Sequence, residues 1–225
     1  MDSPQANLFD YSPAHVGALE AAMSIERLQP YLHDADGDKL KALRLYERNT
    51  QLSEALYGPL QGLEIVWRNA LHIQLTKKFG QQWFDELKKR NLLDFEPLDK
   101  IQVVKDRLKR TGKAETPGRI VAELSFGFWT SLCSKRYMAD LWIGCLNKPF
   151  LGKKIGRADI FQQLDDTRQL RNRVAHHEPI LGRNLEQDFK TIISLVRLVC
   201  GASAAWIEST SCFQERFAAP LPPQL

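Results

Sequence analysis

Apolar residues recur at helical spacing through almost the whole of this 225-residue chain, and this periodicity constrains the fold more than any other feature. Leu60, Leu63 and Trp67, for example, are three or four residues apart and would share one face of a helix. No run of alternating apolar and polar residues indicates a set of strands. The sequence therefore predicts an all-α protein.

Turn-forming residues divide the helical pattern into segments. Gly58-Pro59 is expected to kink or break the longest of them, and Pro30 to interrupt the first. The last two segments are expected to pack antiparallel near the centre of a bundle, because the final one is strongly apolar. The predicted helices cover about residues 13–28, 39–79, 81–88, 97–111, 119–124, 137–146, 157–177 and 185–208.

The length allows one large domain or two small ones, and we interpret residues 1–225 as a single all-helical domain. Residues 1–12 contain Pro, Asn and Ser, and residues 218–225 contain three prolines. Both segments are expected to be loosely structured tails. Ser12-Pro13 is expected to begin the first helix, with serine as the N-cap and proline in the first turn.

The composition, with 44% hydrophobic and 26% charged residues, is typical of a soluble globular protein. No stretch approaches the roughly 18 apolar residues of a membrane span, and no secretion signal is recognisable, so we predict a cytoplasmic protein without membrane contact. The four cysteines form no C-x-x-C unit and are interpreted as reduced, buried thiols. The chain has no Gly-rich phosphate loop, and no cofactor is predicted.

Two features have both a structural and a functional interpretation. A basic run contains Lys105, Lys109 and Arg110, which form either a solvated helix face or a weak RNA-binding surface. An aromatic cluster at residues 126–129 would either stack on bases or, as is more common in helical proteins, fill the core.

Residues 171–177, Arg-Asn-Arg-Val-Ala-His-His, end a long amphipathic segment and carry the strongest chemical signal. Arginine neutralises a phosphate in a bidentate way, and histidine transfers protons near neutral pH. On a helix Asn172 and His176 share a face, as do Arg173 and His177, whereas Arg171 and His176 are about 140° apart. The structural alternative is that these are helix-end residues that pair with nearby carboxylates. A metal site is not predicted, because adjacent helical residues point about 100° apart and do not converge on one ion.

A second polar row, Glu64, Arg68 and His72, has a spacing of four residues along the border of an apolar stripe. One interpretation is an i,i+4 ion pair beside a partly buried histidine. The other is a row of side chains that points into a cleft.

Residues 170–180 (LRNRVAHHEPI) resemble the signature of Abi-like proteins, the abortive-infection proteins of the HEPN superfamily. In that signature an arginine and a polar residue, usually asparagine, are followed after a few residues by a histidine. Residues 63–75 (LEIVWRNALHIQL) and 118–132 (GRIVAELSFGFWTSL) are also similar to this family. The three segments occur in the same order and span about half of the chain.

The resemblance implies a HEPN-like helical bundle with additional helices, often a homodimer whose two motifs meet at the interface. It also implies a metal-independent endoribonuclease that acts as a toxin or phage-defence effector, with an antitoxin protein as a candidate partner. Arg171 and His176 match the ends of the motif, and Asn172 matches its polar neighbour. We therefore expect His176 to act as acid or base, Arg171 to stabilise charge and Asn172 to orient the imidazole or the phosphate. His177 is an extra imidazole that fits a longer register, so which histidine acts stays open. Arg173 is a further candidate, and Glu64, Arg68 and His72 are expected to line the same cleft.

These residue types fit RNA cleavage by the substrate's own 2′-hydroxyl. That reaction needs a base, an acid and positive charge on the phosphorane, and one histidine per chain does not easily fill both proton-transfer roles. A dimer would supply two. The alternative is a catalytically silent helical module that binds RNA or a protein.

Overall fold

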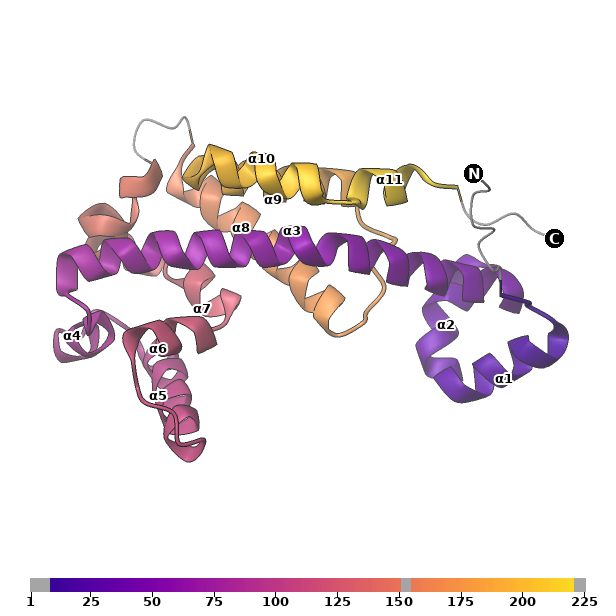
Figure 1. Ribbon diagram of the computed structural model, residues 1–225, viewed down its shortest axis with the longest axis horizontal. Coiled ribbons are helices and arrows are strands. Elements are labelled where there is room, and N and C mark those ends of the chain that lie inside the picture. The colour runs from indigo at the N-terminus through magenta and orange to yellow at the C-terminus, as the bar shows by residue number, and fades with distance from the viewer. Residues whose placement is uncertain (1–8, 151–154, 221–225) are drawn as a thin grey trace, which may run out of the picture.

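Residues 9–150 and 155–220 are described by a computed structural model, and every regular element among them is a helix (Figure 1). The predicted all-α fold is confirmed for this part of the chain. Of the two expected tails, residues 9–12 and 219–220 are non-helical, whereas residues 1–8 and 221–225 lie outside the described residues.

The helix α3 (Lys39–Phe79) runs along the length of the molecule and contacts most other elements (Figure 1). Its 41 residues make it about 60 Å long. The predicted break at Gly58-Pro59 is wrong, because the helix continues through both residues. Pro59 and its neighbours Leu56 and Leu60 are buried, and their packing offsets the roughly 3 kcal/mol that an internal proline costs.

The N-terminal helices α1 (Pro13–Met23) and α2 (Ile25–Asp34) pack beside the start of α3. Ser12 caps α1 by accepting a hydrogen bond from the amide of His15, as predicted. The predicted interruption at Pro30 is wrong, since Pro30 lies inside α2. The break occurs at Ser24 instead, where φ is +68° and the side chain caps α2.

At the other end of α3, short elements close the bundle. They include α4 (Trp83–Lys89), α5 (Phe95–Arg110), α6 (Pro117–Glu123) and α7 (Phe126–Ser131). The segment predicted as an α-helix over 137–146 is wound as a π-helix, Met138–Leu146, between the 3₁₀ turns Lys135–Tyr137 and Lys148–Phe150. Phe126, Phe128 and Trp129 are buried, so the aromatic cluster belongs to the core.

The helices α8 (Arg157–Ala175) and α9 (Leu185–Val199) pack on each other and on α3. The predicted helix over 185–208 is wrong in extent, because Cys200 is extended and α10 (Gly201–Thr210) starts after it. α10 folds back along α9, and an ion pair of 2.9 Å joins Arg197 Nη2 to Glu208 Oε2. The last helix is α11 (Phe213–Ala218).

One main core is built around the buried face of α3, and a small second cluster forms where α2 meets α3. Leu181, which follows α8, packs against both. All four cysteines are free, but only Cys133 and Cys145 are buried. The expectation of four buried thiols is therefore wrong for Cys200, which is half-buried, and for Cys212, which is exposed.

Candidate functional site

The predicted motif lies at the end of α8 and in the turn that follows it. α8 ends at Ala175, and His176 is the first residue after the helix. His177 has φ of +57°, the left-handed region that costs a non-glycine residue about 1 kcal/mol. We call residues 176–180 the histidine turn. This turn redirects the chain after the end of α8.

A cleft of about 580 Å³ lies between α3 and the end of α8. We call it the α3–α8 cleft. One wall comes from a single face of α3 and the other from the last turn of α8 and the histidine turn. Its lining residues are Tyr57, Leu60, Gln61, Glu64, Ile65, Arg68, Arg171, Val174, Ala175 and His177.

Four of the predicted site residues therefore meet in one cleft: Glu64, Arg68, Arg171 and His177. Glu64 and Arg68 come from the first segment that resembles the family, and Arg171 and His177 from the third. About 100 residues of chain separate the two segments. Packing of α8 against α3, which the core positions of both helices drive, is what joins them.

The charges of the cleft are not balanced. Two guanidinium groups, Arg68 and Arg171, face one carboxylate, Glu64. Glu64 Oε2 lies 3.4 Å from Arg171 Nε, an ion pair longer than a direct charge-assisted hydrogen bond. Arg68 donates from Nη1 to the carbonyl of Ala122 at 3.4 Å, and its buried Nε has no hydrogen-bond partner in the described part of the chain. The arrangement suits an anionic ligand.

His72, the third member of the polar row, does not line this cleft. Its Nδ1 accepts a hydrogen bond from the indole Nε1 of the fully buried Trp83 at 3.0 Å. Burial lowers the pKa of His72 below the ordinary value for histidine. A neutral ring is what the indole requires, because the accepting nitrogen must be free of a proton. His72 therefore makes a structural contact, as expected if it is the partly buried histidine of the first interpretation.

Arg173, Asn172 and His176 also lie outside the cleft lining. Arg173 folds back on the histidine turn, where Nη1 donates to the carbonyl of Pro179 at 2.8 Å and Nε lies 3.9 Å from Glu178. Asn172 is half-buried, and its carbonyl accepts the amide of His176 at 2.9 Å. His176 is exposed. In the single chain, His177 is thus the imidazole that shares the cleft with Arg171.

The predicted basic surface is divided in the structure. Lys105 pairs with Asp85 at 2.6 Å and lies 4.7 Å from the centre of the Phe84 ring, so it holds α5 on α4. Lys109 and Arg110 are exposed at the end of α5. The tip of α5 points away from the rest of the bundle in Figure 1.

Sequence reasoning missed Tyr57, Gln61 and Asn49. The first two occupy the same face of α3 as Glu64 and Arg68, so extending that row by one and two turns would have included them. Asn49 is polar but lies three and seven residues before the core positions Leu52 and Leu56. A polar residue in register with an apolar stripe is the one signal that indicates it.

The search for metal sites and membrane-spanning helices in the described residues, and for similar proteins, gave no positive result. No group of three or more His, Cys, Asp or Glu side chains able to hold a metal ion occurs in the described ranges. None of the helices described combines the length and the apolar character that crossing a membrane requires. Comparisons of the chain with protein-family models, curated proteins and solved structures found no match.

Proposed function

We propose that the protein is a metal-independent endoribonuclease of the HEPN type that acts in the cytoplasm as a toxin or phage-defence effector. One observation carries the proposal. The α3–α8 cleft brings Arg171 and His177 together with Glu64 and Arg68, from two of the three segments that resemble this family. An excess of guanidinium charge beside an imidazole is the equipment that phosphodiester cleavage without a metal requires.

In the proposed reaction the ribose 2′-oxygen attacks the adjacent phosphorus and loses its proton to a base. The bond from phosphorus to the 5′-oxygen breaks, and that oxygen takes a proton from an acid. The products are a 2′,3′-cyclic phosphate and a 5′-hydroxyl, so the step consumes no water and needs no metal-bound nucleophile. Arg171 stabilises the charge of the phosphorane, Arg68 binds phosphate, and His177 transfers a proton.

One imidazole does not serve easily as both base and acid, which is a reason to propose a homodimer in which two clefts face each other. The rim of the cleft supports this arrangement. Tyr57 is 63% exposed and Ile65 is 38% exposed, an apolar surface next to the motif. Residues of the second copy, including its His176, would then complete the site. Lys109 and Arg110 would contact RNA outside the cleft, and an antitoxin protein would cover it.

The chemistry is tested by incubating the purified protein with mixed RNA and with DNA of matched sequence in EDTA. RNA cleavage is expected to continue and to leave 2′,3′-cyclic phosphate ends, detectable by mass spectrometry of the fragments. DNA lacks the attacking hydroxyl and is expected to stay intact. Strict dependence on magnesium, or cleavage of both nucleic acids, would overturn the proposed mechanism.

The two histidines are compared with matched single variants. His177→Ala is expected to lower the cleavage rate by about 10²–10⁴-fold, the range typical of lost acid–base catalysis. A smaller loss for His176→Ala would assign proton transfer to the imidazole in the cleft. An equal loss would indicate that both act in a dimer, and a larger loss for His176→Ala would reverse the assignment. Circular dichroism checks that both variants keep their helices.

The alternative function, a catalytically silent RNA-binding module, has one observation in its favour. Glu64 engages Arg171 and must be displaced before a phosphate contacts that guanidinium fully. The same RNA experiment separates the two functions. A gel-shift that depends on Arg171 without any cleavage would establish the silent module.

A further inference from the structure

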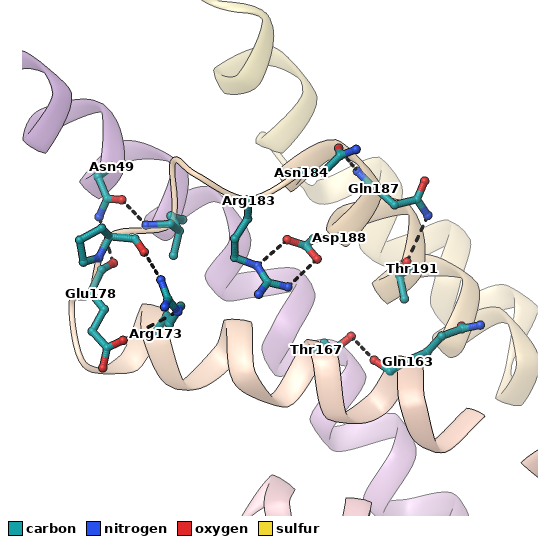
Figure 2. A network of polar contacts seen from close by, with 12 residues as sticks. Asn49, Gln163, Thr167, Arg173, Glu178, Arg183, Asn184, Gln187, Asp188 and Thr191 are labelled. Atoms are coloured by element: carbon teal, nitrogen blue, oxygen red, sulfur yellow. Dashed lines mark hydrogen bonds and ion pairs between the residues drawn. The ribbon is translucent and has the colours of Figure 1, made fainter. Parts of the chain in front are cut away.

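In the histidine turn, four successive residues each have a backbone carbonyl or amide that is hydrogen-bonded by a side chain from outside the turn. Arg27 Nη1 donates to the carbonyl of His177 at 2.8 Å, and Arg173 Nη1 to that of Pro179 at 2.8 Å. Asn49 bonds the turn twice. Its Nδ2 donates to the carbonyl of Glu178 at 3.3 Å, and its Oδ1 accepts the amide of Ile180 at 2.7 Å. Figure 2 shows Asn49 of α3 and Arg173 of α8 reaching the turn from different helices.

Asn49 is the centre of this arrangement. It is 4% exposed, and a buried amide is costly unless both of its ends are bonded. It bonds a carbonyl and an amide that are two residues apart, the same pair of groups that one residue of a parallel β-strand bonds on its neighbour. α8 ends at Ala175, so the turn has no continuing helix to hold its backbone. The side chain of Asn49 replaces that missing support.

Arg27 acts on the residue that lines the cleft. Its acceptor is the carbonyl of His177, which has a left-handed backbone and lines the cleft. Arg27 is itself held by α2, which the small cluster of Tyr31, Ala35 and Ala42 anchors to α3. Leu181, just after the turn, packs against this cluster. The N-terminal helices are thus connected to the histidine turn by both polar and apolar contacts.

We propose that Asn49 and Arg27 are positioning residues, which hold the histidine turn so that the imidazole of His177 stays in the α3–α8 cleft beside Arg171. This inference rests on the proposed function for its effect on catalysis. It goes beyond that function by giving the N-terminal helices a part in assembling the site. Arg171 comes from α8, so the two cleft groups are aligned only while the turn is held against α2 and α3.

The matched control is Arg48. Like Arg27 it is half-buried and donates to a remote backbone carbonyl, that of Phe217 at 2.8 Å, but it holds α11 rather than the turn. The test variants are Asn49→Ala, Asn49→Asp, Arg27→Ala and Arg27→Lys, all in the full-length protein. Asn49→Asp keeps the acceptor for the amide of Ile180 and loses the donor to Glu178. Arg27→Lys keeps one donor.

The first readout is independent of activity. Hydrogen exchange measures protection of the Ile180 amide, and NMR measures the chemical shifts of the His177 ring. Asn49→Ala is expected to lower Ile180 protection about tenfold or more relative to core amides of α9. Both alanine variants are expected to shift the ring signals, whereas Arg48→Ala leaves them unchanged. Unchanged ring signals in both alanine variants would overturn the proposal.

The second readout is RNA cleavage. A misplaced imidazole is expected to lower kcat by about 10–100-fold with little change in KM, because the phosphate-binding groups stay in place. Arg27→Lys and Asn49→Asp are expected to recover part of the loss, and Arg48→Ala to keep the normal rate. If the ring moves while kcat stays normal, the positioning role is wrong and the endoribonuclease proposal stands. If the unmodified protein cleaves no RNA, the proposed function fails, and the ring signals alone decide whether the turn is positioned.

Discussion

Two hollows of this protein each contain an arginine from the same helix, yet they differ in what faces that arginine. Arg171 of α8 lies in the α3–α8 cleft, and Arg168 lies three residues earlier in a hollow of about 310 Å³ between α5, α7 and α8. We call the second hollow the α5–α7–α8 groove. Its lining residues are Glu96, Lys100, Gly127, Thr130, Ser131, Ser134, Phe161, Asp165 and Arg168.

The groove pairs all of its charged side chains, whereas the cleft leaves one guanidinium without a carboxylate. In the groove Arg168 contacts Asp165 at 2.7 Å, and Lys100 contacts Glu96 at 2.7 Å, so two cations meet two carboxylates. In the cleft the one carboxylate lies 3.4 Å from Arg171, and Arg68 has no carboxylate partner there. Position on a helix therefore does not make an arginine available to a phosphate. The carboxylates decide it: Asp165, on the same helix, compensates Arg168, whereas α3 supplies one carboxylate for the two guanidinium groups of the cleft.

The largest expected difference between the hollows is in RNA cleavage. Arg171→Ala is expected to lower the rate by about 10²–10³-fold, the range for losing one donor to a developing oxyanion. Arg168→Ala, a matched change one helical turn away, is expected to stay within about twofold, because its charge is already compensated. Initial rates with one RNA substrate measure both. Equal losses would show that the charge imbalance does not distinguish the hollows.

A smaller difference is expected in RNA binding. Arg68→Ala is expected to weaken binding of an uncleavable 2′-O-methyl RNA several-fold and to lower the log–log salt slope by about 0.7, the value for one phosphate contact on a single strand. Lys100→Ala in the groove is expected to leave the slope unchanged. Fluorescence anisotropy across a salt series measures the slopes. A change that is the same for both variants would break the comparison.

The smallest effect concerns stability in the groove. Burial acts to raise the pKa of Asp165, but hydrogen bonds from Gln169 and Arg168 and the charge of Arg168 outweigh it and lower the pKa. The stabilisation is therefore present above the unfolded carboxyl pKa of about 3.9 and is lost as the pH falls through the lower folded value. Asp165→Asn is expected to cost about 0.5–1 kcal/mol at pH 7 and less near pH 3, measured by urea unfolding.

Asp166→Asn is the control for this measurement. Asp166 is exposed and accepts one hydrogen bond from Gln162, so its removal is expected to change the free energy of unfolding very little at either pH. If Asp165→Asn costs the same at pH 7 and pH 3, the loss comes from the shape of the side chain and not from its charge.

Much of the fold follows from local patterns. The helical period identifies most of the helices, although α7 and α11 lie outside the predicted ranges, and Ser12 begins α1 as its sequence context predicts. The errors occur at single residues where tertiary packing outweighs the local preference. Pro59 is buried in a continuous helix, and Pro30 is tolerated within α2, because packing and capping elsewhere outweigh the usual preference of proline. Cys200 ends α9 although the apolar pattern continues past it.

The site was predicted less completely than the fold, for a physical reason. Glu64 and Arg68 were identified by their spacing on one helix and Arg171 by its place in the motif that resembles the family, and the three do share a cleft. His72 follows the same spacing but lies against Trp83, and Arg173 is used to hold the histidine turn. Spacing on one helix specifies which side chains share a face. It does not specify what packs against that face.

The sequence by itself determined the helical class and the residue types at the end of α8, because periodicity and capping act over a few residues. Only the tertiary structure decided which of the two adjacent histidines shares a cleft with Arg171. It also decided that the side chain of Asn49 bonds the turn that follows these histidines. The amide of Asn49 and its acceptor in the turn are about 130 residues apart in the chain. Such a contact depends on how α3, α8 and α2 pack, and no local pattern encodes it.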